Sequence, residues 1–272
     1  MFNMLKKIIK KNRTVYHLAR KFYSYYSYFR NKSILDKNKE LKNKYLGERC
    51  FVIGNGPSIN QQDLTKLKNE YAFACNHFYL HKELSVINPV FYSMIEPIIL
   101  NDSFRENLFP KIIERINSYA SSNPNAIFLF NFQYKNYIEN NNLFLKNKIY
   151  YFLFGGSISN RMNLEMSKPN PSGMASIYFM LAMARYLGFK MIYIIGCDSN
   201  YILDGYEKHF YSEDLTLQKK KSNLEAARIL YEDLERLDIF YKYFQKEGFQ
   251  IFNAGVGGMI DVFPRVDYNS LL

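Results

Sequence analysis

The chain has few cysteines and no long apolar run. Its three cysteines, Cys50, Cys75 and Cys197, show no metal-ligand spacing, are odd in number, and lie in or beside apolar segments. This pattern favours reduced thiols and a cytoplasmic compartment. No stretch of about 18 apolar residues is present, as a membrane-spanning helix requires, and no short apolar segment is followed by a cleavage-like site. We therefore expect neither a membrane span nor a secretion signal.

Three short motifs of nucleotide-dependent enzymes are also missing. The 272 residues contain no GxGxxG spacing of dinucleotide folds, no GKS or GKT of P-loops, and no Asp-X-Asp sequence. Binding of NAD, or of ATP at a P-loop, is therefore not indicated. The lack of Asp-X-Asp disfavours a metal-clamped sugar diphosphate, so we expect no metal ion and no separate cofactor.

What the chain does have is 48% apolar and 17% aromatic residues, which excludes a disordered protein. Its basic charge is concentrated at the N-terminus: residues 1–47 hold 13 Lys and Arg against two acids, whereas residues 48–272 hold 23 of each sign. Apolar and aromatic residues between Leu5 and Phe29 recur mostly three or four apart, which predicts an amphipathic basic helix. The Lys- and Asn-rich segment 35–49 favours a polar linker or a frayed helix.

The basic helix suits the anionic inner face of the cytoplasmic membrane, where Lys and Arg meet headgroups and tyrosines lie at headgroup depth. The alternative is a helix packed on its own domain or on a partner subunit. We expect a peripheral location at that inner face, with residues 1–47 as helix, linker and membrane-surface anchor and residues 48–272 as the domain. Nucleic acid is disfavoured, because the rest of the chain has no basic surplus. Assembly into a homo-oligomer stays open.

After residue 48, strand-like runs alternate with helical patterns. Residues 103–119, 173–187 and 222–247 are predicted helices. Several strand-like runs are apolar on both faces, as in a parallel sheet covered by helices. The order predicts a single Rossmann-like α/β domain with a doubly wound, mostly parallel sheet. The seven predicted strands are CFVIG (50–54), YAFACN (71–76), VFYSMI (90–95), AIFLF (126–130), IYYFLF (149–154), MIYIIGCD (191–198) and FQIFNA (249–254).

Glycines and polar residues follow several of these strands. The stretch CFVIGNGPSI (50–59) passes from apolar residues into Gly-Asn-Gly-Pro-Ser, which is typical either of a tight turn or of a loop that holds a phosphate. Ligands of doubly wound sheets bind at the carboxyl ends of the strands, and amide, hydroxyl and backbone groups suit a sugar nucleotide. The candidate binding residues are Gly54, Asn55, Gly56, Ser58, Asn76, Ser93, Ser172, Gly173, Asp198 and Asn253.

The motifs VIGNGPSI, ACNHFYL, PVFYSM and SGMASIYFMLAMARYLGFKMIYIIGCD follow one another in an order that resembles the small bacterial sialyltransferases, which use CMP-sialic acid. They also resemble the related Rossmann-like domain of motility-associated flagellin glycosylation proteins. The resemblance covers most of residues 49–265. It implies a variant GT-A-type fold and a metal-independent, inverting transfer of a sialic acid-like sugar from a CMP donor. The implied acceptor is a hydroxyl of a surface glycan, in lipooligosaccharide, capsule or glycoprotein.

The same resemblance implies roles for single residues. His209, in YEKHFY, would be the general base, and a neighbouring tyrosine, Tyr201, Tyr206 or Tyr211, would steady the leaving phosphate. The donor-binding roles would be divided between Asn55 and Ser58 for phosphate and sugar, Asn76 for the nucleotide, Ser172 and Gly173 for the sugar, and Asp198 for the cytidine ribose or base.

Two other functions stay open. A related archaeal family with pterin pyrophosphokinase activity shares the Gly-Asn-Gly-Pro-Ser start, and that reaction needs ATP and Mg²⁺. A non-catalytic partner in surface-glycan assembly would bind a ligand without turning it over. Nucleotide selectivity and turnover separate these functions from a CMP-dependent transferase.

Overall fold

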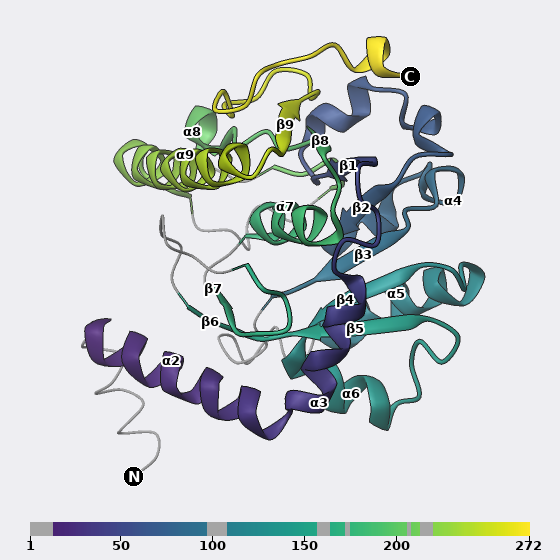
Figure 1. Cartoon of the computed structure of the whole chain (residues 1–272). Coiled ribbons are helices and arrows are strands. Elements are labelled where there is room, and N and C mark those ends of the chain that lie inside the picture. The colour runs from purple at the N-terminus through teal and green to yellow at the C-terminus, as the bar shows by residue number, and fades with distance from the viewer. Residues whose placement is uncertain (1–12, 97–107, 157–163, 172–174, 206–207, 213–219) are drawn as a thin grey trace.

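The computed structural model describes residues 13–96, 108–156, 164–171, 175–205, 208–212 and 220–272. Its centre is a seven-stranded sheet in which every pair of neighbouring strands is parallel (Figure 1). The predicted doubly wound α/β sheet is thus confirmed, and it is parallel throughout. In the order in which they lie, the strands are β5 (Lys148–Phe152), β4 (Ile127–Asn131), β3 (Phe91–Met94), β2 (Ala72–Cys75), β1 (Arg49–Ile53), β8 (Met191–Ile195) and β9 (Gln250–Asn253).

Each of the seven predicted strands contributes to this sheet, but one of them divides. The run IYYFLF supplies β5 and then β6 (Phe154–Gly156), which pairs with β7 (Asn170–Pro171) in a separate two-stranded sheet. Leu153, between β5 and β6, is buried in a small apolar cluster with Tyr28 and Leu35 from the N-terminal helices. The chain therefore leaves the main sheet where Leu153 meets those helices.

Helices cover both faces of the sheet. Alternate residues of β1 point to opposite faces, because side chains alternate along a strand. Cys50 and Val52 lie in one apolar cluster with α7 (Ser176–Leu187) and α9 (Asn223–Lys246), whereas Phe51 and Ile53 lie in a second cluster with α5 (Phe109–Ser122). Short helices also occur at α4 (Leu84–Ile87), α6 (Lys135–Asn140) and α8 (Tyr201–Asp204).

The three predicted helices correspond to α5, α7 and α9. Helix α7 is buried over Tyr178–Ala184, as expected for a helix that is apolar all round. It ends at Gly188, whose φ of 96° is left-handed and favours glycine. Helix α5 is described from Phe109, and the first part of its predicted range, residues 103–107, lies outside the described residues.

The described part of the N-terminal region, which starts at residue 13, begins with helices, and its polar segment is packed on the domain. Helix α2 (Arg13–Arg30) is followed by α3 (Lys32–Asp36) and a 3₁₀ turn over Lys37–Leu41. Leu35 and Leu41 are buried, and the Asn38 amide donates to the backbone carbonyls of Tyr151 (2.9 Å) and Met166 (2.8 Å). The predicted linker is therefore a structured part of the domain surface. No helix in the described parts of the chain combines the length and the apolar character that crossing a bilayer requires.

The strand order reverses between β1 and β8. From β1 the chain builds outward through β2, β3, β4 and β5, and it then returns to place β8 and β9 on the other side of β1. The loops that follow β1 and β8 belong to opposite directions of winding. In open parallel sheets this is where a crevice opens at the carboxyl ends of the strands, so it is the first place to look for a ligand site.

Candidate functional site at the strand-order reversal

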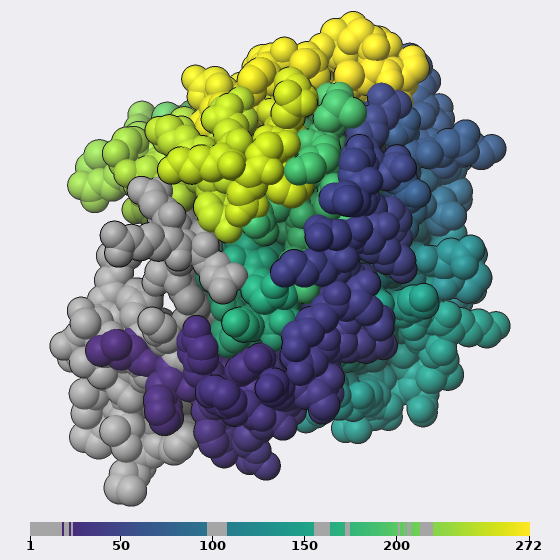
Figure 2. Space-filling view, in the orientation of Figure 1, coloured from purple at the N-terminus to yellow at the C-terminus, as the bar shows by residue number. Residues whose placement is uncertain are grey.

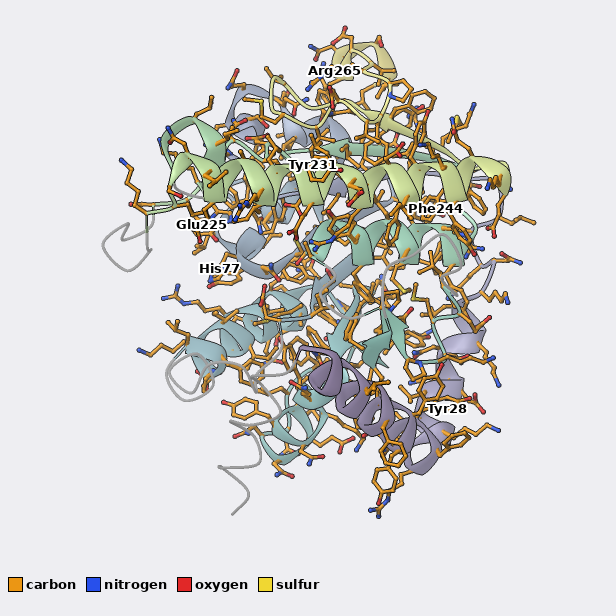
Figure 3. All side chains as sticks on the ribbon, turned by 90° about the vertical axis from the view of Figure 1, so that its left-hand side faces the viewer. Tyr28, His77, Glu225, Tyr231, Phe244 and Arg265 are labelled. Carbon is orange, nitrogen blue, oxygen red and sulfur yellow. The ribbon has the colours of Figure 1, made fainter. Side chains whose placement is uncertain are left out.

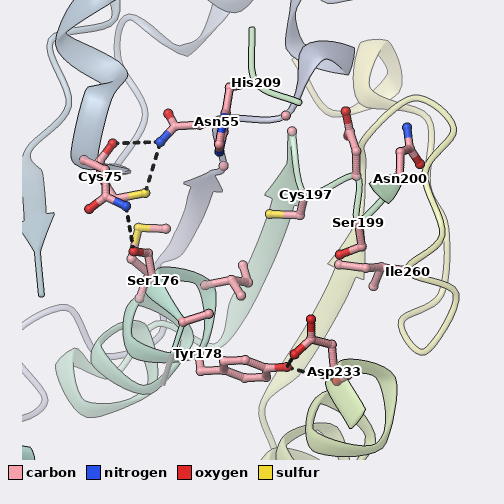
Figure 4. Close-up of a pocket in the computed structure, with 18 of the residues that line it drawn as sticks. Asn55, Cys75, Ser176, Tyr178, Cys197, Ser199, Asn200, His209, Asp233 and Ile260 are labelled. Atoms are coloured by element: carbon pink, nitrogen blue, oxygen red, sulfur yellow. Dashed lines mark hydrogen bonds between the residues drawn. The ribbon is translucent and has the colours of Figure 1, made fainter. Parts of the chain in front are cut away.

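A pocket of about 240 Å³ lies at the predicted place (Figure 4). Its walls come from the loops after β1, β2 and β8, the first turn of α7, the segment that contains His209, and the facing side of α9. Six of the sequence-predicted site residues line it: Gly54, Asn55, Gly56, Asn76, Asp198 and His209. The pocket is the point at which segments more than 150 residues apart in the chain meet.

The two glycines of Gly-Asn-Gly are explained first by protein packing. A Cβ on Gly54 would lie 2.3 Å from the carbonyl oxygen of Gly196, and one on Gly56 would lie 2.6 Å from the Asp198 carboxylate. The Gly56 N–H also donates to the Gly196 carbonyl at 2.8 Å. The loops after β1 and β8 thus interlock with no room for side chains. Because this packing alone requires glycine, Gly54 and Gly56 are not in themselves evidence of a phosphate cradle.

Asp198 is the centre of this interlock. It is buried, and its carboxylate accepts hydrogen bonds from both the backbone N–H (2.9 Å) and the hydroxyl of Ser58. Ser58 is buried as well and does not line the pocket. Ser58 therefore acts through Asp198, which it holds in place, while Asp198 itself faces the cavity. Each carboxylate oxygen keeps a second lone pair with which it can accept a bond from a ligand.

Two asparagine side chains present unpartnered oxygens in the pocket wall. The Asn55 amide nitrogen donates to the Cys75 carbonyl at 3.2 Å, and the Asn76 amide nitrogen donates to the Ser176 hydroxyl at 3.0 Å (Figure 4). The Oδ1 atoms of Asn55 and Asn76 are both buried and have no hydrogen-bond partner in the structure. A buried acceptor without a partner costs about 1–3 kcal/mol, and because neither oxygen is exposed to the cavity, a ligand recovers that energy only if the two amide groups turn toward it.

Asn76 is held in an uncommon backbone conformation. Its φ of 50° lies in the left-handed region, which asparagine tolerates better than most residues. Tyr92 holds this turn with two hydrogen bonds: its hydroxyl donates to the Asn76 carbonyl and accepts from the Tyr79 N–H, both at 2.8 Å. Burial raises the pKa of Tyr92 well above its usual value, which keeps this hydroxyl protonated and able to donate. The strained turn and its buried support position the Asn76 amide at the cavity.

One end of the pocket is suited to an anion. Ala175, Ser176 and Ile177 line it, and they form the N-terminus of the 12-residue helix α7. The N-cap residue is Ala175, whose methyl group cannot cap the N–H groups of the first turn. Backbone donors and the positive end of the helix dipole therefore face the cavity, and Lys208 adds a basic side chain to its lining.

His209 lies across from this helix end and beside Asn55 (Figure 4). The next residue anchors it, because the Phe210 N–H donates to the Asn55 carbonyl at 2.8 Å. The imidazole stacks on the Tyr211 ring, with ring centres 5.1 Å apart and an interplanar angle of 5°. His77 packs against Tyr211 at 5.2 Å. The ring of His209 is thus oriented by its neighbours while it faces the cavity.

The remaining predicted residues are placed elsewhere. Ser93 is buried and does not line the pocket. Asn253 is buried too, and its amide is used within the protein: Nδ2 donates to the Ile260 carbonyl (2.8 Å) and Oδ1 accepts from the Gly255 N–H (2.9 Å). Tyr211 does not line the pocket, but it stacks on His209, which does. Ser172, Gly173 and Tyr206 lie outside the described residues, as does the side chain of Tyr201, whose backbone begins α8.

Several lining residues were not predicted from sequence. Cys75 and Cys197 contribute to the wall, and burial raises the pKa of the Cys75 thiol to about 12 and that of Cys197 further still. Both thiols stay protonated at neutral pH, so neither is an activated nucleophile. Tyr178 bonds through its hydroxyl to the Asp233 carbonyl (3.0 Å), which ties α7 to α9 at the back of the cavity. In the sequence, the stretch SGMAS (172–176) indicated where α7 begins.

Two further observations limit the site. Arg265, a conceivable anion ligand by its charge, instead donates to the carbonyls of Gly258 (3.1 Å) and Ile260 (3.3 Å), and Figure 3 shows it far from His77. Within the described residues, no cluster of three or more His, Cys, Asp or Glu side chains has the arrangement of a metal site.

Comparisons with known proteins give one distant likeness. No protein-family model matches the chain, and no curated protein matches it. Among solved structures, the sialyltransferase CstII from Campylobacter jejuni, in complex with a substrate analogue, cytidine-5′-monophosphate, matches with a TM-score of 0.43 and 14% sequence identity. The match covers 82% of this chain and 86% of that chain. A similarity of this size is too distant to carry a functional inference.

Proposed function

We propose that the protein is a glycosyltransferase that moves a sialic acid-like sugar from a CMP donor to an acceptor hydroxyl, with inversion and without a metal ion. The observation that carries the proposal is the pocket itself. It combines the buried, unpartnered oxygens of Asn55 and Asn76, the uncapped N-terminus of α7, and His209. The resemblance of the sequence motifs to CMP-dependent sialyltransferases supports the same function.

In this proposal the donor lies between the loops after β1, β2 and β8. The phosphate of CMP meets the N–H groups at the start of α7 and the Lys208 ammonium, which together stabilise the charge that develops as the bond to the sugar breaks. The side chains of Asn55 and Asn76 turn so that their buried amide oxygens accept hydrogen bonds from the nucleoside, whose ribose hydroxyls and base amino group are donors. A monophosphate leaving group needs only such hydrogen bonds.

His209 performs the proton transfer. A glycan hydroxyl is a weak nucleophile, and an inverting displacement needs a base that takes its proton as the new C–O bond forms. An imidazole can accept that proton near neutral pH, and stacking on Tyr211 orients the ring toward the cavity. The acceptor is a glycan or glycolipid, and the N-terminal region keeps the enzyme at the inner face of the cytoplasmic membrane, where such acceptors are assembled.

Nucleotide selectivity tests the proposal directly. CMP should raise the melting temperature of the protein in the presence of a chelator, because a ligand that binds only the folded state stabilises it by about 2.7 kcal/mol at 100 times its Kd. The melting temperature is also measured with UDP, GDP and ATP, each with and without Mg²⁺. The Asn55→Ala variant should lose most of the response, whereas Asn269→Ala, at the exposed C-terminal turn, should keep it.

The outcomes discriminate between the open functions. A much larger shift with UDP or GDP, or a shift that requires Mg²⁺, would refute a CMP donor. A shift specific to ATP with Mg²⁺ would favour the pterin pyrophosphokinase-like reaction. CMP binding without release of CMP from CMP-sialic acid, across a panel of glycan acceptors, would favour the non-catalytic partner.

A further inference from the structure

Helix α2 has an inner face that the domain covers and an outer face that it leaves exposed. Ser24 and Tyr28 face inward: both are buried, and Tyr28 packs with Leu35 and Leu153. Figure 3 labels Tyr28 on this helix, and α2 lies alongside β6. The inner face therefore fixes α2 to the body of the protein, which determines where the outer face points.

The outer face is a stripe of large apolar side chains exposed to solvent. Phe22 and Phe29 are 77% and 70% exposed, and Leu18, Tyr25 and Tyr26 are exposed beside them. At 100° per residue these five positions fall within about 100° of arc, and the centre of that arc lies about 150° from Ser24 and about 110° from Tyr28. Single exposed apolar residues are ordinary, but five in one stripe on an anchored helix mark an interaction surface. In Figure 2, the described atoms of α2 lie at the surface on the lower left of the molecule.

Charge identifies the partner of this stripe. Residues 1–47 carry 13 Lys and Arg against two acids, which is the whole positive surplus of the protein. Arg30 stands at the edge of the stripe, where its guanidinium donates to the Tyr26 hydroxyl at 3.2 Å, and Lys32 next to it is exposed. Two copies of this chain brought together through α2 would oppose like charges, which disfavours self-association. An anionic bilayer instead matches both the apolar stripe and the basic flank.

We propose that the outer face of α2, formed by Leu18, Phe22, Tyr25, Tyr26 and Phe29, binds the surface of an anionic lipid bilayer. The helix lies in the interface with the phenylalanines at the acyl boundary, the tyrosines at headgroup depth and the basic residues against lipid phosphates. This proposal specifies which surface gives the membrane location named under the proposed function. The surface is separate from the pocket, so the proposal does not depend on whether the pocket transfers a sugar.

The test is co-sedimentation of the full chain with vesicles. The protein should sediment with phosphatidylcholine vesicles that contain phosphatidylserine, and it should bind pure phosphatidylcholine vesicles much more weakly. Binding should also fall at high salt, since the basic residues contribute through charge. The Phe22→Ser/Phe29→Ser variant should lower the partition coefficient by roughly tenfold or more for each phenylalanine.

A matched control removes an exposed apolar residue elsewhere. Val86 is exposed on α4, which lies on the other side of the molecule from α2 (Figure 1), and Val86→Ser should leave vesicle binding unchanged. Circular dichroism and the CMP-induced melting shift of each variant show that the fold and the pocket are intact. Unaltered binding by the double phenylalanine variant, or equal binding to neutral and anionic vesicles, would overturn the proposal. So would a wild-type oligomer that the double variant converts to a monomer in light scattering, which would show that α2 pairs copies of the chain.

Discussion

At the scale of single residues, two kinds of side chain follow the strands. Some line the pocket, and others hold those pocket residues in position. The sequence was sufficient to predict Asn55 and Asn76 at the pocket, because each directly follows a buried strand and the ends of parallel strands meet. The sequence could not show that Ser58 donates a hydrogen bond to Asp198, because the two residues are 140 positions apart. Nor could it show that the Asn253 amide is used by its own loop. Such partners are set by tertiary packing, which leaves no local pattern.

His209 offers the sharpest test of the catalytic mechanism. If the proposed function holds, His209→Ala should lower kcat about 10²- to 10⁴-fold with little change in CMP affinity, because in that proposal the imidazole takes the acceptor proton and does not hold the nucleotide. His77→Ala, in the same ring cluster but outside the pocket lining, is the comparison and should lose far less. Turnover and CMP affinity are measured on both proteins. A His209→Ala turnover within about threefold of wild type would eliminate it as the base.

His81 makes the stability of the protein depend on pH. It is buried against Phe78 and Phe210, and burial lowers its pKa below the usual value near 6.5. Its Nδ1 accepts from the Glu83 N–H at 3.2 Å, which requires that nitrogen to be unprotonated. The unfolded chain therefore binds the proton more readily than the folded one. This contribution to stability is complete above about pH 6.5 and is lost as the pH falls through the folded-state value.

Urea unfolding at a series of pH values measures this effect. The free energy of unfolding of the wild type should fall between about pH 7.5 and pH 5, and the difference between wild type and His81→Asn should narrow over the same range. Two parallel curves would show that other groups carry the acid sensitivity. Because Phe210 adjoins His209, the loss of His81 packing should also weaken CMP binding at low pH.

At the scale of elements, the loops after β1 and β8 form one structural unit. Gly56→Ala would place its Cβ 2.6 Å from Asp198 and 2.7 Å from the Gly196 carbonyl, so backbone has to move. We expect it to destabilise the fold by about 1–3 kcal/mol and to weaken CMP binding, because Asn55 lies between the two glycines. Ser270→Ala, in the exposed C-terminal turn, is the control and should leave both unchanged. Calorimetry with and without CMP gives both quantities, and a fully stable, CMP-binding Gly56→Ala protein would contradict the interlock.

The boundaries of the helices and strands show which parts of the fold are specified by the local sequence. Helices α7 and α9 and all seven sheet strands were predictable, because long apolar or periodic runs dominate their packing. The break between β5 and β6 was not, since nothing in IYYFLF itself distinguishes Leu153 from its neighbours. That residue leaves the sheet because Tyr28 and Leu35, more than 100 positions earlier, cover it.

At the scale of the whole molecule, charge and topology divide the chain into two parts. The positive surplus is confined to residues 1–47, and the balanced remainder forms the sheet and the pocket. The polar segment that joins α2 to the sheet is packed on the domain at Asn38 and Tyr45. The Asn38 amide donates to the Tyr151 carbonyl, and the Tyr45 N–H donates to the Leu187 carbonyl at 2.8 Å. Any surface that α2 contacts is therefore held in a defined relation to the sheet, because no free linker joins the two in the described chain.

The strand order also determines when the pocket can exist during synthesis. Gly54 and Ser58 emerge from the ribosome about 140 residues before Asp198, and β1 has no β8 beside it until that later stretch is made. Pairing across such a sequence distance closes a long loop and forms late compared with local contacts. A nascent or truncated chain that ends before β8 can therefore build the β1–β5 half of the sheet but not the cavity. A nucleotide bound as proposed, which is a ligand of the completed fold only, would then favour full-length molecules over partly made ones.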